Sequence, residues 1–473
     1  MKINKTFKEL AGNTIIFAIA EFSAKLVSFI LMPLITLNLS PEVFGKAEYI
    51  VNLSELLYPL FTVGLTDALL RFTIKDKTNL KNHPVDILAS CTLIGVLGSI
   101  IMIIGFLCLD RFHLTKDHAL CCFLFISVFV STFLGQYLRG LDLNIYFALS
   151  GIIRSLSLFV TFFLFVIYKQ GEYTGYVTSI IVSNLISTFY MIVILLIKKI
   201  PFIGSFEKQL TKKMLKYSLP LIPNMLCWWG IQLSNKYFLT FFYDIGMFGI
   251  YTSISKIATL INIVSIVFGK AWTVSAVKIS DKKEYEFNSV LFRLYSSLII
   301  LGASFLILCL PLISKVLLRG EYFQYWSLTS ISLLIAVFNC YSAFFGPFYS
   351  VNYNNLLNLL STFIGFIIIL STSFIFIPRL GLLGALISSL MGYAVLAIFR
   401  YYTTKSISNI VPNTILEISS LTILIIQGFA SLFNSDKLQM YFFINTLSLI
   451  ILFSMNYFSM KQSFKKMLVS EVM

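Results

Sequence analysis

The chain has 473 residues, of which 58% are hydrophobic and 12% are charged, whereas soluble domains average roughly 45–50% and 25%. Runs of about 20 apolar residues recur along its whole length, which predicts an all-α integral membrane protein without room for a separate soluble domain. The net charge of +15 could indicate a nucleic-acid partner, but the basic residues gather between apolar runs. They are therefore predicted to set the membrane topology.

About fourteen apolar runs are predicted transmembrane helices. Their bounds are 13–37, 44–70, 87–109, 118–139, 145–168, 174–197, 216–242, 247–274, 290–314, 324–348, 356–377, 382–402, 411–433 and 439–460. An even number places both termini on one side, and most of the 36 lysines and arginines, Arg400 among them, fall in segments on that side. The positive-inside rule then predicts cytoplasmic termini in a multi-pass protein of the cytoplasmic or inner membrane.

The first run carries Glu21 and Lys25, one helical turn apart with the acid first. It lacks a small-residue cleavage pattern, so we expect a span and not a cleaved signal peptide. The two charges either neutralise each other within the helix or both line a cavity. We favour the cavity, because a lipid-facing pair would lose hydration that one weak bond cannot restore.

The second run places Glu48, Asn52 and Glu55 on one helical face, with Glu55 near mid-depth. Asp67 and Arg71 follow near its inner end, again one turn apart. These last two are equally well explained as an interfacial anchor or as a gate.

Arg154, about ten residues into the fifth run, and three lysines are the basic residues inside later spans to which we give most weight. Lys256 lies ten residues beyond Gly246, which is roughly 15 Å along a helix and close to the middle of a ~30 Å core. It has no acid four residues away on either side, so we expect an anion from elsewhere. Lys236 and Lys270 lie nearer the span ends, where a long side chain can reach the headgroups.

The charges predicted at mid-depth come from four different helices. Charges at one depth on separate helices are typical of a shared hydrated cavity, whereas isolated structural ion pairs have little reason to align. The residues concerned are Glu21, Lys25, Glu55, Arg154 and Lys256.

No pattern predicts a metal site, a disulfide or a catalytic centre. The seven cysteines are odd in number, mostly lie inside apolar runs and lack paired CxxC spacing. The three histidines form no ligand pair. A phosphate-binding glycine loop and a nucleophile–base set are also absent, so we expect no cofactor and no enzymatic activity.

The basic segment 198–216 is the longest inner loop predicted, and we take it as the link between two lobes. Residues 40–45 resemble residues 243–249, and residues 169–171 resemble 379–381, at nearly the same spacing. A six-helix unit used twice would explain both similarities and would place a substrate site between the lobes. The predicted division is 1–200, 201–405 and 406–473, the last part being two helices packed against lipid.

Four stretches together resemble a known family: Phe376–Ala385, Phe248–Tyr251, Gly64–Phe72 and Gly320–Tyr322. The chain resembles, over nearly its whole length, the O-antigen and capsule repeat-unit flippases of the multidrug/oligosaccharidyl-lipid/polysaccharide (MOP) superfamily. The resemblance implies a two-lobed bundle that moves an undecaprenyl-diphosphate-linked oligosaccharide to the outer leaflet by alternating access. Glycan polymerases and other assembly proteins would be its partners. One departure is the segment 351–355, which is basic in the family and uncharged here.

The resemblance further implies that basic residues of a central cavity face the diphosphate and the sugars. The matching positions are Lys25, Arg154, Lys236 and Lys256. Lysine and arginine can pair the diphosphate oxygens while the prenyl tail stays in lipid. Transport could be driven by the membrane potential, at about 2.3 kcal/mol per charge per 100 mV. H+ or Na+ exchange through Glu21 or Glu55 is an equal alternative, with Asp67 and Arg71 as gating candidates.

Two other functions remain as alternatives. A multidrug or cation antiporter of the same superfamily should carry an excess of acidic residues at mid-depth, and here basic residues narrowly predominate. A membrane glycan polymerase or ligase should carry a large outer loop, and none longer than about ten residues is predicted.

Overall fold

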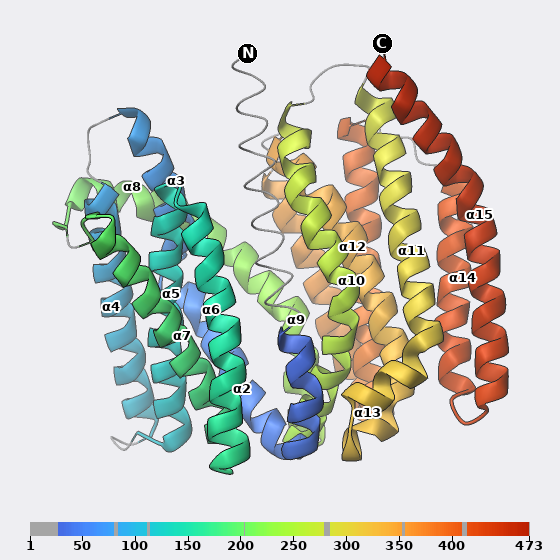
Figure 1. The fold of residues 1–473 in the computed structure, drawn as a ribbon, viewed down its shortest axis with the longest axis horizontal. Helices are drawn as coiled ribbons and strands as arrows, with labels where there is room; N and C mark the ends of the chain where they lie inside the picture. Colours follow the sequence, from blue (N-terminus) through green and yellow to red (C-terminus); the bar gives the residue numbers. More distant parts are fainter. Residues whose placement is uncertain are drawn as a thin grey trace. The chain divides into compact units, whose positions relative to one another are not determined.

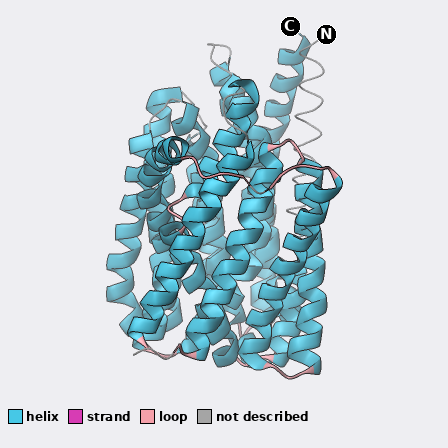
Figure 2. Ribbon diagram, turned by 90° about the vertical axis from the view of Figure 1, so that its left-hand side faces the viewer, coloured by secondary structure: helices cyan, strands magenta, loops and turns pink. Residues whose placement is uncertain are grey.

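The computed structural model describes residues 27–79, 84–110, 114–202, 204–278, 284–351, 355–408 and 414–472. Within these ranges all regular structure is helical and no strand occurs (Figure 2). The predicted all-α class is therefore confirmed. The chain separates into two compact units, Met1–Trp229 and Gly230–Met473.

A described helix lies at each of the predicted spans, residues 13–26 of the first span lying outside the described residues, and two of the cases are irregular. α2 (Pro41–Phe61) and α3 (Leu65–Asn79) cover the predicted span 44–70 as two helices that are bent by 57° at the break between them. α13 (Asn355–Ser408) is long enough for two spans, and its backbone is non-helical at Gly381. In the described residues nine helices, or ten with the bent pair, are long and apolar enough to cross a membrane. This is a multi-pass membrane protein.

Unit 1 holds the helices coloured blue to green in Figure 1. They are the helix Val27–Asn38, α2, α3, α4 (Pro84–Leu109), α5 (Lys116–Gly140), α6 (Asn144–Phe162) with its π-helical end η1 (Phe163–Tyr168), α7 (Glu172–Ile197), α8 (Lys208–Ser218), η2 (Leu219–Leu221) and the start of α9 (Ile222–Phe242). α7 packs against α2, α5 and α6 and so joins the helices that carry the predicted charges of this unit.

The break between α2 and α3 has a local cause. Val63 and Gly64 both adopt positive φ angles, 53° and 61°, a conformation that glycine tolerates and a β-branched residue rarely adopts. Gly98 of α4 lies so close that an added Cβ would be 1.9 Å from the Phe61 carbonyl oxygen. A side chain at position 98 would therefore push α4 away from the break.

The segment 198–216, predicted as a loop, contains the amphipathic helix α8. Leu210 and Met214, one turn apart, are buried, and α8 packs against α3 and α4. Its lysines lie on the exposed face of the helix. The loop prediction was wrong here because a short helix with one apolar stripe is stabilised by packing and not by its own length.

Unit 2 holds the end of α9 and the helices coloured light green to red (Figure 1). They are α10 (Ile245–Lys278), α11 (Glu284–Leu317), η3 (Gly320–Leu328), α12 (Thr329–Val351), α13, α14 (Thr414–Phe433) and α15 (Leu438–Val472). The boundary between the compact units lies inside α9. The transport lobes predicted with bounds at 200 and 405 stay a prediction.

α14 and α15 are hydrogen-bonded into unit 2. Gln427 donates to the Ser304 carbonyl oxygen over 3.2 Å, and Ser297 donates to Asn456 over 2.9 Å. Tyr441 donates to the backbone of Ile307. These two helices are thus part of the polar core of unit 2 as well as of its outer surface.

Arg400, counted above among the residues of an inner segment, is buried in unit 2 with 3% of its surface exposed. Its guanidinium donates to Ser361 Oγ, to the Ser342 carbonyl oxygen and to Asn358 Oδ1 at 2.8–3.1 Å. Arg400 thus satisfies its charge within the helix bundle, and its assignment to the inner side stays a prediction.

Candidate functional site

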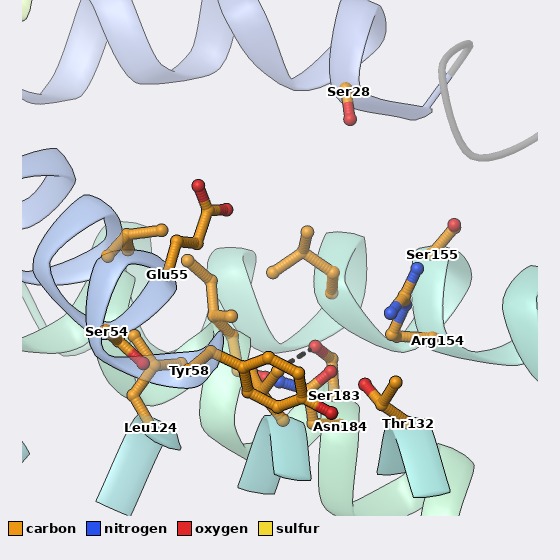
Figure 3. Close-up of a pocket in the computed structure, with 14 residues that line it drawn as sticks. Ser28, Ser54, Glu55, Tyr58, Leu124, Thr132, Arg154, Ser155, Ser183 and Asn184 are labelled. Atoms are coloured by element: carbon orange, nitrogen blue, oxygen red, sulfur yellow. Dashed lines mark hydrogen bonds between the residues drawn. The ribbon is translucent and has the colours of Figure 1, made fainter. Parts of the chain in front are cut away.

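A cavity of about 400 Å³ lies within unit 1, a size typical of small-molecule sites. Figure 3 shows it between the helix that carries Ser28 and the helices that carry Glu55 and Arg154. The residues that line it are Ser28, Val51, Ser54, Glu55, Tyr58, Leu124, Val128, Thr132, Arg154, Ser155, Leu158, Ile180, Ser183 and Asn184. They come from the helix Val27–Asn38 and from α2, α5, α6 and α7.

Helical periodicity brings the polar residues to this face. On α2 the lining positions are 51, 54, 55 and 58, and on α7 they are 180, 183 and 184. Spacings of three and four place these side chains on one stripe of each helix. The cavity thus combines polar and apolar side chains that share one stripe of each helix.

Glu55 and Arg154 are the charged residues of the cavity lining. Both side chains extend into the same space, and Ser28 faces it from the opposite helix (Figure 3). The guanidinium can bind phosphate or carboxylate oxygens through two parallel hydrogen bonds. The carboxylate can accept hydrogen bonds from sugar hydroxyls or hold a cation.

Hydroxyl and amide groups form the rest of the polar wall, and most are held by neighbours. Tyr58 and Thr66 share a 3.1 Å hydrogen bond that crosses the α2–α3 break. Asn184 donates to Ser127 over 3.3 Å, and Ser155 donates to the Gly151 carbonyl oxygen over 2.9 Å. These bonds fix the orientation of the wall before any ligand binds.

Glu48 and Asn52, predicted on the same helix face as Glu55, are buried within unit 1. Tyr176 of α7 donates a 3.1 Å hydrogen bond to the Glu48 carboxylate. Asn52 donates to the Glu48 backbone over 2.5 Å, and the Asn52 carbonyl oxygen accepts from Trp229 over 3.5 Å. The two residues tie α2 to α7 and α9, and Glu55 extends into the cavity.

The other predicted site residues lie elsewhere. Asp67 and Arg71 are exposed on α3, and the Arg71 guanidinium is 4.4 Å from the centre of the Tyr217 ring. Lys236 and Lys256 are partly buried in unit 2, and the Lys236 ammonium is 5.3 Å from the Phe248 ring centre. Glu21 and Lys25 fall outside the described residues. The structure therefore brings together Glu55 and Arg154, and the larger shared cavity stays a prediction.

The sequence analysis missed Glu417. It lies in the first turn of α14, is 7% exposed and lines a second pocket in unit 2. The prediction treated helices 411–433 and 439–460 as a lipid-facing appendage because they lack charge at mid-depth. The polar run Tyr295–Ser297 in a neighbouring apolar helix was the signal that could have pointed to a buried acid.

Within the described ranges, no group of three or more His, Cys, Asp or Glu side chains is placed to hold a metal ion. The chemistry that these helices offer is that of charged and hydroxyl side chains.

Comparison with known proteins finds one matching family model and several solved structures with a similar fold. The family model described as "Polysaccharide biosynthesis protein" matches residues 10–274. No curated protein sequence matches significantly. Among solved structures, the chain is similar to the lipid II flippase MurJ in an inward closed conformation, with 15% identity, a TM-score of 0.67 and coverage of 94% of this chain and 99% of that one.

Two further structures share the fold. One is the inward-facing form of a multidrug resistance MATE family transporter of the MOP superfamily, with 15% identity, a TM-score of 0.61 and coverage of 84% and 94%. The other is a MOP superfamily transporter from Pyrococcus furiosus, with 16% identity, a TM-score of 0.59 and coverage of 85% and 96%. At such identities the likeness establishes the fold.

Proposed function

Because the chain belongs to the polysaccharide biosynthesis protein family and has the fold of the MOP-superfamily transporters, we propose that it flips a lipid-linked oligosaccharide across the membrane. The substrate we propose is an undecaprenyl-diphosphate-linked oligosaccharide that is moved from the cytoplasmic to the outer leaflet for surface polysaccharide assembly. The protein would act in the cytoplasmic or inner membrane with both termini in the cytoplasm. O-antigen and capsule are both compatible products.

The observation that supports this substrate is the cavity of unit 1. Arg154 gives it a permanent positive charge on a membrane-spanning helix, and Ser28, Thr132 and Tyr58 surround it with hydroxyl groups. An arginine in such a place is costly unless it is paired, faces a hydrated path or binds a ligand. A diphosphate bearing sugars needs a cation for its oxygens and hydrogen-bonding groups for its hydroxyls.

Alternating access would then expose this cavity to the two sides of the membrane in turn. Lys25, Lys236 and Lys256 are proposed as further contacts to the diphosphate and sugars. The energy would come from the membrane potential, which favours outward movement of an anion from a negative interior, or from H+ or Na+ exchange through Glu21 or Glu55. Asp67 and Arg71 are proposed gating residues.

Replacement of Arg154 tests the proposal. Hydrogen bonds to charged groups contribute about 1.5–3 kcal/mol, so Arg154→Ala should weaken transport roughly 10- to 100-fold. Arg154→Lys should retain part of it, because the charge persists without the planar fork. Arg319→Ala is the matched control, since Arg319 is exposed and lies outside the cavity.

The measurement is surface glycan in a strain that lacks its own copy, with the lipid-linked precursor measured in parallel. A flippase defect leaves the precursor intact and unexported, whereas loss of an enzyme of the pathway removes the precursor. Normal export by a stable Arg154→Ala variant would contradict the proposal.

A cation antiporter of the same superfamily is the second candidate, and Glu55 in the same cavity is the observation that favours it. In that case Glu55→Gln should abolish resistance to cationic compounds and Arg154→Ala should leave it unchanged. A glycan exporter should show the opposite dependence on Arg154.

A further inference from the structure

Unit 2 contains a buried carboxylate that none of the roles above uses. The pocket around it, here named the Glu417 pocket, has a volume of about 340 Å³ and is lined by Phe292, Phe338, Tyr341, Ala397, Ile398, Tyr401, Tyr402, Glu417, Ile418, Leu421, Thr422 and Ile425. Its walls come from α11, α12, the second half of α13 and α14. All of these helices belong to unit 2, so the pocket is separate from the cavity of unit 1.

The carboxylate is held in a fixed position. Ser296 Oγ donates to Glu417 Oε1 over 2.7 Å, and the Tyr341 hydroxyl donates to Oε2 over 3.0 Å. Both donors are buried. A carboxylate has about four lone-pair sites, and these two bonds occupy one on each oxygen, so acceptor capacity remains on a side chain that lines the pocket.

Charged and titratable groups surround Glu417. Arg293, one turn before Ser296 on α11, attracts the carboxylate and therefore competes with a bound cation. Tyr341 of α12 and Tyr401 and Tyr402 of α13 are the titratable groups of the pocket wall. Their rings and that of Phe292 present the aromatic surface to which cations are attracted. A buried carboxylate with donors of this kind is stabilised further when a cation neutralises it.

We propose that the Glu417 pocket binds a small monovalent cation, either a proton on the Glu417 carboxylate or Na+ coordinated by it. The site is new relative to the coupling candidates Glu21 and Glu55, because it lies in unit 2 and on α14. Binding itself does not depend on the proposed substrate. Use of the cation to drive transport rests on the proposed function.

Two measurements on purified full-length protein separate the two cations. The first follows thermal unfolding as Na+ replaces choline at constant ionic strength, and bound Na+ should raise the Tm by about 2–4 °C. The second follows the carboxylic acid C=O stretch by infrared difference spectroscopy as pH is lowered. Glu417→Gln should lose the response that the wild type shows. Glu321→Gln, which alters an exposed carboxylate of unit 2, should keep it.

A probe of the wild type keeps the proposal testable if Glu417→Gln does not fold. Dicyclohexylcarbodiimide reacts with protonated carboxyls in apolar surroundings, and mass spectrometry locates the product. Glu417 should be modified, and Na+ at fixed pH should slow the reaction if Na+ is the ligand. If only pH changes the rate, the ligand is the proton.

Several results would overturn the proposal. In the unfolding and infrared measurements, equal responses to Na+ and to pH in the wild type and in Glu417→Gln would contradict it. In the carbodiimide experiment, the contradicting results are no modification of Glu417, or a modification rate that is independent of both pH and Na+. Failure of the proposed function would give a different result. Variants of the unit 1 cavity would then leave glycan export unaffected, while cation binding at Glu417 persisted.

Discussion

Replacing Gly98 by alanine should loosen the contact between α4 and the α2–α3 break. The added Cβ would lie 1.9 Å from the Phe61 carbonyl oxygen, and contacts of 3.0–3.4 Å are already tight, so the two backbones must separate by about 1.1–1.5 Å. Overpacking of this kind costs about 1–3 kcal/mol. Alanine recovers about 0.5–1 kcal/mol through its helix propensity, which leaves a net loss of up to about 2.5 kcal/mol and of about 1 kcal/mol at the middle of both ranges.

Gly105 provides the matched control because it lies on the same helix and has no atom within 4 Å of an added Cβ. Gly105→Ala should be neutral or slightly stabilising. Both variants are compared with the wild type by thermal unfolding in detergent, followed by circular dichroism. Equal stability of Gly98→Ala and Gly105→Ala would refute the argument. Export should fall with Gly98→Ala as well, since Phe61 is one turn from Tyr58 of the cavity.

Three further predictions concern topology, a turn and a site residue. A single cysteine at Lys208 should be shielded from an impermeant thiol reagent in intact cells and one at Lys437 labelled, and the reverse pattern would invert the predicted orientation. Gly381→Ala should lower the free energy of unfolding by about 1–3 kcal/mol, because the φ angle of 56° strains any other residue. Gly151→Ala, which has open space around the added Cβ, should not lower it, and thermal unfolding of both variants tests the difference. Lys256→Ala should abolish glycan export with normal membrane levels and Lys256→Arg should retain part, and full export by Lys256→Ala would reject its role.

The spans could be predicted because long apolar runs have one stable arrangement in a bilayer. The prediction 87–109 falls within α4, and 174–197 falls within α7. The bend after Phe61 could not be predicted in the same way, since the positive φ at Val63 is contrary to the preference of a β-branched residue.

The candidate site was partly predictable for a related reason. Glu55 and Arg154 stand out as charges deep inside apolar runs, and the structure places both at one cavity. Glu417 does not stand out, because it lies within the first turn of its helix, where an acid is ordinary. Its burial follows from neighbours on α11 and α12, which no local pattern reveals. The ligand roles of all these residues stay predictions.

The hydrogen bonds of Arg400 have a consequence for how the protein is made. Inserting an arginine into the membrane costs up to about 2.5–3.5 kcal/mol, which is the value for the centre of a helix. Its acceptors come from Ser342, Asn358 and Ser361. All three precede Arg400 in the chain, so synthesis delivers them first. The guanidinium can therefore be satisfied as its own helix enters, which makes α12 and the first half of α13 an internal template for the segment that follows.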